Sequence, residues 1–291
     1  MNSREQVILR LLKMRGGKVG RLDLIKLLFL TRENLDIKAR KTFYGFVPYK
    51  YGPYSFAAGY DLDKLRDRGY LSFPDDRTVA LTDVGYAEDR RMKSAPLIQS
   101  MAFTDMRTRG LNTDGLLDKV YRSYPWFTLN TVRLGWHPPE RPVAEPAVYT
   151  VGYEGVQIDD FLDRLLRVGI KQLIDVRKNP VARRYGFHRS TLAALCHHIG
   201  VDYLHLPVFG ITSEMRQNLD SDAAYDSLFR KYRQDVLPPL IAEIQELALS
   251  MTEKPSALMC AEENPRHCHR THLAAVVAEN TGMAVRDITG E

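Results

Sequence analysis

The chain has 291 residues, enough for two domains with separate hydrophobic cores. Its composition, 44% hydrophobic and 26% charged, is typical of an ordinary globular protein. No apolar run approaches the roughly 18 residues of a membrane span, the N-terminus has no secretory pattern, and the three cysteines fit a reducing cytosol. We therefore expect a cytoplasmic protein that does not bind membranes.

The charge is divided unevenly along the chain. Residues 1–148 contain 25 Lys and Arg against 17 Asp and Glu, whereas the remaining residues contain 16 against 19. A basic half joined to a slightly acidic half is typical of a protein whose first half binds a polyanion. A solvated surface explains the same numbers, so charge alone does not decide between the two interpretations.

Residues 1–95 are predicted to form helices followed by a β-hairpin. Ser55 is a candidate N-cap for the helix that ends near Gly69. The hairpin of residues 72–82 turns at Pro74–Asp76 and carries Arg77 beside its tip. This order resembles a winged helix-turn-helix domain, in which a helix enters the major groove and the basic hairpin contacts the DNA backbone.

The aromatic-rich stretch Thr42–Ser55 resembles antitoxin-associated Panacea-type domains. Tyr51 in this stretch is a candidate for stacking on a base. A hydrophobic core is the more common explanation of such a cluster. Residues 96–147 are expected to form a helical connector that ends in a proline-rich linker from Trp136 to Pro146.

From residue 148 onward the sequence alternates between predicted strands and predicted helices. Strands are expected over residues 148–151, 172–176, 202–206 and 257–260, with a further candidate over 284–288. This alternation predicts an α/β fold with a doubly wound, mostly parallel, Rossmann-like sheet, preceded by the mainly helical winged helix-turn-helix domain. We expect residues 148–291 to be the catalytic domain.

The carboxyl ends of parallel strands lie along one edge of the sheet, where ligands bind. The predicted edge gathers carboxylates and basic side chains, and surface ion pairs would not select one edge in this way. The candidate catalytic residues are Glu154, Asp175, Glu262 and Glu263. The candidate substrate-binding residues at this edge are Tyr153, Arg177, Arg183, Arg184, His205, Arg266, His269 and Arg270.

The same segments resemble a known family, the domain of unknown function numbered 488, over about residues 147–290. Five blocks carry the resemblance in order: Thr150–Gly155, Asp175–Pro180, Gly186–Phe187, His205–Pro207 and Cys260–Arg270. The resemblance implies a Rossmann-like fold. The family name itself records that a general activity is not settled.

One chemical hypothesis uses a cysteine nucleophile. Cys260 and Arg266 have the spacing of a phosphatase loop, in which a thiolate attacks phosphorus. Glu262 and Glu263 lie inside that loop and would repel a phosphate, so this hypothesis is not favoured.

Two further hypotheses involve metals. Cys268, His269 and His272 are close in sequence, but no second pair of zinc ligands is evident from the spacing. Asp175 and Glu262 are suited to holding magnesium beside arginines, as in a metal-dependent nuclease.

The favoured hypothesis is metal-free hydrolysis of an N-glycosidic bond in DNA, with no cofactor. A carboxylate activates water or stabilises an oxocarbenium-like sugar, and the base is flipped into the pocket. Glu154 is expected to contact the base or the water, and Tyr153 to stack on the base. A resemblance to a phage-defence DNA glycosylase favours this reading over the nuclease and implies a bulky modified phage base, which spacing and composition do not show.

The expected partner is double-stranded DNA, specifically phage DNA with modified bases, and a homodimer is an option. A different class of protein stays open from the residues alone. In that alternative, the chain is a winged-helix DNA-binding regulator whose second domain senses a nucleotide.

Overall fold

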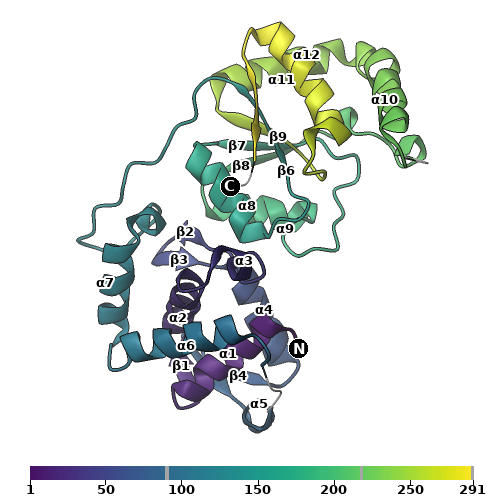
Figure 1. Ribbon diagram of the computed structural model, residues 1–291. Coiled ribbons are helices and arrows are strands. Elements are labelled where there is room, and N and C mark those ends of the chain that lie inside the picture. Colours follow the sequence, from purple (N-terminus) through teal and green to yellow (C-terminus); the bar gives the residue numbers. More distant parts are fainter. Residues whose placement is uncertain (89–91, 217–218, 290–291) are drawn as a thin grey trace. The chain divides into compact units, whose positions relative to one another are not determined.

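The computed structural model describes residues 1–88, 92–216 and 219–289. It contains two compact units, Met1–Glu140 and Arg141–Glu291, which are described separately (Figure 1). Within the described ranges, the helices are all too short or too polar to cross a membrane.

The first unit is mainly helical. Its helices are α1 (Ser3–Met14), α2 (Arg21–Glu33), α3 (Ile37–Arg40), α4 (Phe56–Asp67), α5 (Asp83–Ala87), α6 (Ala95–Thr108) and α7 (Thr113–Ser123). Its strands are β1 (Lys18–Gly20), β2 (Val47–Tyr49), β3 (Gly52–Tyr54), β4 (Leu71–Asp75) and β5 (Thr78–Leu81). Strands β1, β5 and β4 form an antiparallel sheet, and β2 pairs with β3 in a separate hairpin.

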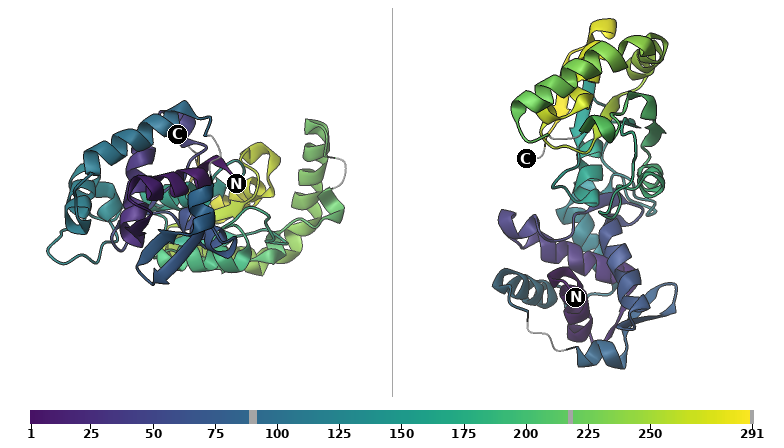
Figure 2. Two further views of the ribbon diagram at one scale, coloured as in Figure 1. Left: turned by 90° about the horizontal axis from the view of Figure 1, so that it is seen from below. Right: turned by 90° about the vertical axis from the view of Figure 1, so that its right-hand side faces the viewer.

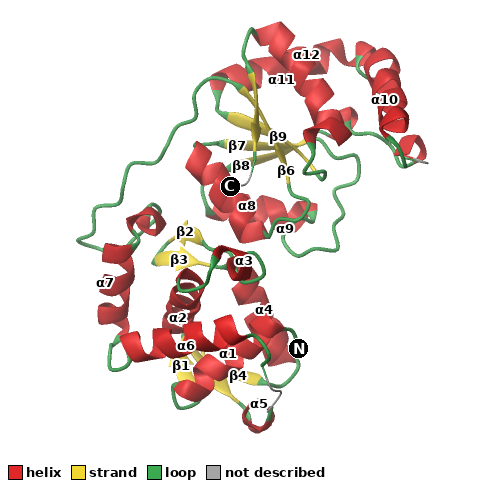
Figure 3. Ribbon diagram, viewed as in Figure 1, coloured by secondary structure: helices red, strands yellow, loops and turns green. Residues whose placement is uncertain are grey.

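Helix α2 is the centre of this unit because most of its residues are buried. It packs against α1, α6 and α7. The connector expected over residues 96–147 is therefore divided, because its two helices belong to the core of the first unit and residues 141–147 belong to the second. Residues 129–147 contain neither helix nor strand and are green in Figure 3.

The hairpin predicted over residues 72–82 is present as β4 and β5, and it projects from the helices in both views of Figure 2. Ser55 is confirmed as the N-cap of α4, because its hydroxyl accepts a hydrogen bond from the backbone N–H of Ala58. Between α2 and α4, however, the chain inserts α3 and the β2–β3 hairpin, where a helix-turn-helix motif has a turn of about 3–4 residues. The exposed side of α4 mixes Asp67 with Arg66 and Arg68 and is not a basic face.

The second unit is an α/β layer structure. Its strands are β6 (Val148–Gly152), β7 (Gln172–Asp175), β8 (Asp202–His205), β9 (Ser256–Cys260) and β10 (Val285–Ile288). Its helices are α8 (Ile158–Val168), α9 (Arg189–His198), α10 (Asp222–Lys231), α11 (Ile241–Glu253) and α12 (His269–Thr281). A π-helical turn, Tyr232–Val236, extends α10 before Pro238 and Pro239.

The five strands follow the order β10-β6-β9-β7-β8, and every neighbouring pair is parallel. Helices α8 and α9 cover one face, and α11 and α12 cover the other (Figure 1). The predicted parallel α/β sheet is thus confirmed. The strand order differs from the common dinucleotide-binding order, in which the first two strands are neighbours, because β9 lies between β6 and β7.

The alternation of side chains along the strands explains this layering. Val148, Ile174 and Leu258 point into a core shared with Leu273 and Val277 of α12. Their sequence neighbours face the opposite side, because successive strand residues point to opposite faces. Since both faces are buried, β6 and β9 consist of buried residues throughout.

A buried amine distinguishes the core of the first unit. Lys26 on α2 is 1% exposed, and its Nζ donates a hydrogen bond of 2.8 Å to the carbonyl oxygen of Pro53. Burial lowers the pKa of this amine to about 7, against the opposing effect of Asp23. Between pH 7 and the usual Lys pKa of 10.5, the unfolded chain therefore binds a proton that the folded chain does not.

We expect the free energy of unfolding to rise with pH through this window, by about 1.4 kcal/mol per pH unit from Lys26 alone. Lys26→Met should remove that contribution, because methionine does not titrate. The free energy of unfolding of the parent protein should therefore rise relative to that of the variant as the pH increases from 7 to 10. Urea denaturation of both proteins across this range measures the difference. Parallel stability curves would contradict the assignment.

Candidate functional site at the carboxyl edge of the sheet

A buried ion pair organises the carboxyl edge of the second sheet. Asp175 ends β7 and is 0% exposed. Arg177 binds both of its oxygens, with Nε donating to Oδ1 over 2.8 Å and Nη2 donating to Oδ2 over 2.6 Å. The backbone N–H of Arg177 also donates to Oδ1. This bidentate arrangement fixes the guanidinium in one orientation.

The pair continues into a hydrogen-bonded chain that joins three strands. The Nη1 of Arg177 donates to the hydroxyl of Tyr153, which follows β6, over 3.0 Å. The hydroxyl of Tyr203 on β8 donates to Oδ2 of Asp175 over 2.6 Å. The ring of Tyr153 stacks on Phe187, with centroids 4.2 Å apart. These hydrogen bonds therefore fix the positions of β6, β7 and β8 relative to one another at this edge of the sheet.

The protonation states in this chain follow from burial and pairing. Burial by itself lowers the pKa of Arg177, but its hydrogen bonds to Asp175 and the charge of that carboxylate outweigh burial and raise it. Burial and the neighbouring Asp175 raise the pKa of Tyr203. Arg177 is thus held as a cation and Tyr203 as a neutral donor.

The geometry around Asp175 does not favour the catalytic role that the sequence predicts for it. Both of its oxygens are occupied by Arg177 and Tyr203, and none of its surface is exposed. A carboxylate in this position cannot reach a substrate or a nucleophilic water. Asp175 is a positioning residue that orients Arg177, and through it Tyr153.

Two other carboxylates are exposed where β6 and β9 end. The backbone N–H groups of Tyr153 and Glu154 both donate to the carbonyl oxygen of Ala261, which ties the two loops together. The N–H of Glu263 lies 3.4 Å from Oε2 of Glu154, and both glutamate side chains are exposed. Because β6 and β9 are neighbours, the strand order places these two predicted catalytic residues side by side.

Gly152 makes this close approach sterically feasible. A Cβ atom at this position would lie 2.0 Å from the carbonyl oxygen of Glu262 and 2.9 Å from the Cα of Glu263. Both are backbone atoms, which cannot give way as a flexible side chain does. The loop that carries Glu262 and Glu263 therefore rests directly on the end of β6.

Glu262 differs from its neighbour because its carboxylate is engaged on both sides. Its Oε1 accepts a hydrogen bond of 2.9 Å from Nη1 of Arg216. Its Oε2 accepts from the thiols of Cys260 and Cys268, at 3.0 and 3.1 Å. Burial and the adjacent Cys260 raise the pKa of this carboxyl, and Arg216 opposes the shift.

The two thiols lie in a buried cluster with His269. The Sγ atom of Cys260 is 3.7 Å from Nδ1 of His269, and the ligand atoms of Cys260, Cys268 and His269 all lie within 4.8 Å of one another. A hydrogen bond from Cys268 holds the pKa of the Cys260 thiol well below its usual value, against the effect of burial. Burial raises the pKa of Cys268. His272, weighed as a ligand from sequence, instead contacts Nη1 of Arg233.

The burial of His269 and Arg270 likewise does not favour the substrate contacts predicted for them. His269 is 1% exposed, and Arg270 is 0% exposed. Arg270 donates to the carbonyl oxygens of Glu262 and Glu263, and it pairs with Asp287 on β10 over 3.4 Å. These bonds hold the main chain of the loop that carries Glu262 and Glu263.

The remaining predicted residues of this edge are more accessible. Arg183, Arg184 and Arg266 are exposed, although one amine of Arg184 donates to the carbonyl oxygen of Val156. His205 is half-buried, and its Nε2 lies 2.9 Å from the carbonyl oxygen of Arg177. In the first unit, Tyr51 and Arg77 are exposed at the turns of the β2–β3 and β4–β5 hairpins, which lie at opposite ends of that unit (Figure 1). The structure does not bring these two together.

Three residues that contact the predicted site residues were not predicted from the sequence. Tyr203 alternates with His205 on β8, and a period-two reading of that strand would have placed both on one face. Phe187 lies in a block already noted for the family resemblance. Arg216 comes from the irregular segment after β8, and its sequence context carries no signal for a contact with Glu262.

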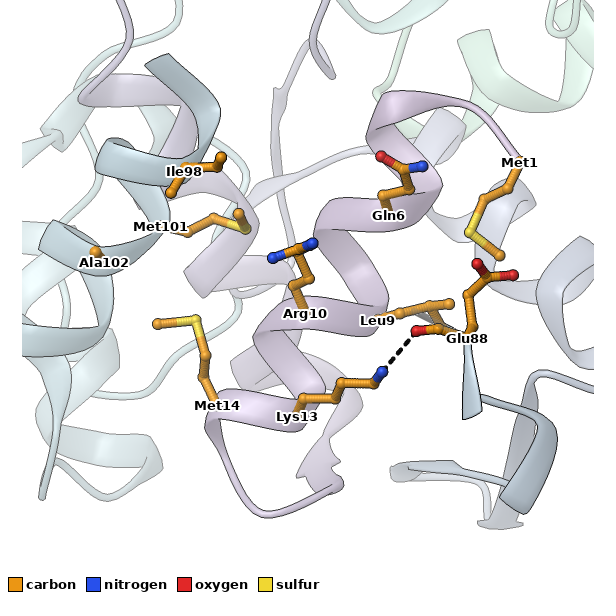
Figure 4. A pocket seen from close by; sticks show the side chains of 10 residues that line it. All are labelled: Met1, Gln6, Leu9, Arg10, Lys13, Met14, Glu88, Ile98, Met101 and Ala102. Atoms are coloured by element: carbon orange, nitrogen blue, oxygen red, sulfur yellow. Dashed lines mark hydrogen bonds between the residues drawn. The ribbon is translucent and has the colours of Figure 1, made fainter. Parts of the chain in front are cut away.

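The described parts of the chain include the following two hollows. One, of about 400 Å³, lies beside β8, and its polar lining includes Arg189, Tyr203 and His205. The other, of about 270 Å³, belongs to the first unit and lies between α1 and α6, where Lys13 donates to the carbonyl oxygen of Glu88 (Figure 4). The hollow beside β8 reaches His205, the last residue of that strand, and so adjoins the carboxyl edge of the sheet.

The second unit is an α/β protein with a parallel sheet. Its charged side chains gather at the carboxyl edge of that sheet, where ligands bind in open α/β folds. Residues 157–277 match the family described as Domain of unknown function DUF488. The match confirms the resemblance for this part of the second unit, and it begins after the block Thr150–Gly155 that was also attributed to it. No curated protein matches the chain.

The role of Asp175 predicts a large stability effect. Asp175→Asn should destabilise the protein by about 3–5 kcal/mol, because it leaves the buried Arg177 without a counter-ion. Asp202→Asn on β8 is a matched control, since its ion pair with Lys254 is exposed and is worth about 0–1 kcal/mol. Chemical denaturation compares the two variants. Equal losses of stability would show that the buried pair stabilises the protein no more than the exposed pair does.

Proposed function

We propose that the protein is a DNA-directed hydrolase that breaks N-glycosidic bonds, a DNA glycosylase acting on modified bases in antiviral defence. The observation that carries the proposal is the pair of exposed carboxylates, Glu154 and Glu263, at the tips of the neighbouring strands β6 and β9. Paired carboxylates are the usual equipment for hydrolysis of a glycosidic bond through an oxocarbenium-like transition state.

In the proposed reaction, the bond between the sugar C1′ and the base nitrogen breaks, and the bonding electrons leave with the base. One carboxylate removes a proton from water as the oxygen bonds to C1′, and the base nitrogen gains a proton. We assign the water to Glu154, which lies in the turn after Gly152, and the electrostatic stabilisation of the sugar to Glu263. The products are an abasic site and the free base.

Several features of the same sheet edge suit a flipped nucleotide. The Tyr153 ring is fixed by Phe187 and Arg177, so it offers a rigid wall beside Glu154. Exposed Arg183 and Arg266 supply positive charge for flanking phosphates. The hollow beside β8 lies at the same edge of the sheet, two strands away from β9.

The geometry favours this chemistry over the alternatives that the residues left open. A magnesium nuclease built on Asp175 and Glu262 would need free carboxylate oxygens, but Arg177, Tyr203, Arg216 and the thiols occupy them. A phosphatase would need an accessible thiolate, but Cys260 is 0% exposed. Exposed carboxylates remain the groups that a substrate can reach.

We expect purified protein to release bases from DNA that contains glucosylated cytosine and to leave unmodified DNA intact. Mild alkali would then cleave the product strands at abasic sites, without added metal. Glu154→Gln and Glu263→Gln should each lower the rate by about 10²–10⁴-fold, because each removes a carboxylate from the transition state. Quantified strand cleavage after alkali measures the rates.

The control is Glu246→Gln, which changes an exposed glutamate on α11 and should retain full activity. Strand breaks that require Mg²⁺ and no alkali would favour a nuclease. Absence of product from any DNA, with DNA binding intact in both carboxylate variants, would favour the DNA-binding regulator.

The basic first half is proposed to bind duplex DNA through the β4–β5 hairpin, in the manner of a wing. Arg77→Ala should weaken binding uniformly across sequences and reduce the slope of log K against log salt by about 1, because one phosphate contact is lost. Arg122→Ala removes an exposed arginine from α7 and serves as the control. Fluorescence anisotropy at several salt concentrations gives both slopes, and an identical loss in the two variants would oppose a specific role for the hairpin.

A further inference from the structure

The buried thiol cluster, Cys260, Cys268 and His269, lies at the connection between β9 and α12. Cys260 is the last residue of β9, and Cys268 and His269 open α12 after the loop of residues 261–267. Cys260, Cys268 and His269 are 0%, 1% and 1% exposed. The cluster plays no part in the proposed hydrolysis, since a substrate cannot reach it.

Three donor atoms, the Sγ atoms of Cys260 and Cys268 and a ring nitrogen of His269, all lie within 4.8 Å of one another, close enough to share one metal ion. Tetrahedral zinc with sulfur, nitrogen and oxygen ligands requires donor-to-donor distances of about 3.5 Å. The structure places Sγ of Cys260 3.7 Å from Nδ1 of His269 and 3.0 Å from Oε2 of Glu262. Sγ of Cys268 is 3.1 Å from the same oxygen. Glu262 therefore lies beside both thiols, and the mutually close group consists of Cys260, Cys268 and His269.

The histidine is oriented for metal binding. Nε2 of His269 lies 3.2 Å from the carbonyl oxygen of Val176, which can only accept a hydrogen bond. In the neutral imidazole Nε2 therefore carries the proton, and the lone pair of Nδ1 points at Cys260. Metal-binding histidines commonly show this arrangement, in which the second nitrogen donates to a backbone carbonyl.

The charges of the cluster also balance with a divalent cation. Two thiolates and the Glu262 carboxylate would place three negative charges in a buried site, which is costly without compensation. Arg216, whose Nη1 lies 2.9 Å from Oε1 of Glu262, supplies one positive charge. A divalent ion supplies the other two.

We infer that the second unit binds one Zn²⁺ through Cys260, Cys268, His269 and Glu262. Two thiolates select zinc over magnesium or calcium, which prefer oxygen ligands. On binding, the thiols release their protons to solvent and their sulfurs bond to the ion. The ion links the end of β9 to the start of α12, and it thereby fixes the loop that presents Glu263. Glu262 already contacts both thiols, and a small movement of its side chain completes the four ligands of a structural site.

The test is elemental analysis of the untagged full-length chain, purified without chelator or added metal, which should contain about one zinc per chain. Cys260→Ser and Cys268→Ser should each retain less than about a tenth of that zinc after dialysis. Cys196→Ser is the matched control, because Cys196 is equally buried but lies on α9 outside the cluster, and it should retain all of its zinc.

A second measurement uses the parent protein alone, so that a poorly folding variant does not decide the matter. Co²⁺ added to reduced, metal-free protein should give a thiolate charge-transfer band and the intense visible bands of a tetrahedral ion. Parent protein that holds no zinc and gives no such band, or cysteine variants that keep full zinc, would overturn the inference. DNA enters neither measurement, so failure of the proposed hydrolysis would leave this result intact.

Discussion

The carboxyl edge of the second sheet depends on one buried ion pair, Asp175 with Arg177. The bidentate pair uses Nε and Nη2 of Arg177. The third nitrogen, Nη1, donates to the hydroxyl of Tyr153, which follows β6 on the other side of β9. Tyr203 completes the chain on β8. Because burying a charge is costly unless it is paired and hydrogen-bonded, the strand ends can move apart only by exposing or orphaning these groups. The edge is therefore held as a rigid platform.

This platform separates two kinds of carboxylate. Asp175 is buried and Glu262 is partly buried, and hydrogen bonds from other side chains occupy both carboxylates. Glu154 and Glu263 are exposed on adjoining loops. The occupied groups determine where the loops lie, and the exposed groups are left for a ligand. A division of this kind accounts for several acidic residues at one edge without assigning chemistry to all of them.

The sequence predicts the sheet well because strands buried on both faces appear as short apolar runs, and the charged residues after them mark the carboxyl edge. It does not predict which charges turn inward. Asp175 and Arg270 look like ligand-binding residues, but their partners come from distant segments whose pairing depends on the tertiary fold. The insertion of β9 between β6 and β7 is similarly absent from local spacing, and it places the loop after Cys260 beside the end of β6. In the first unit, the hairpin was predictable from its turn residues, whereas the insertion between α2 and α4 was not.

The contact at Gly152 has an evolutionary consequence. A side chain there would collide with the main chain of Glu262 and Glu263, so the glycine and the conformation of that loop must change together. Homologues that replace the glycine should also have altered length or composition immediately after β9. Such paired variation would separate relatives that keep the exposed carboxylate arrangement from those that have acquired a different one.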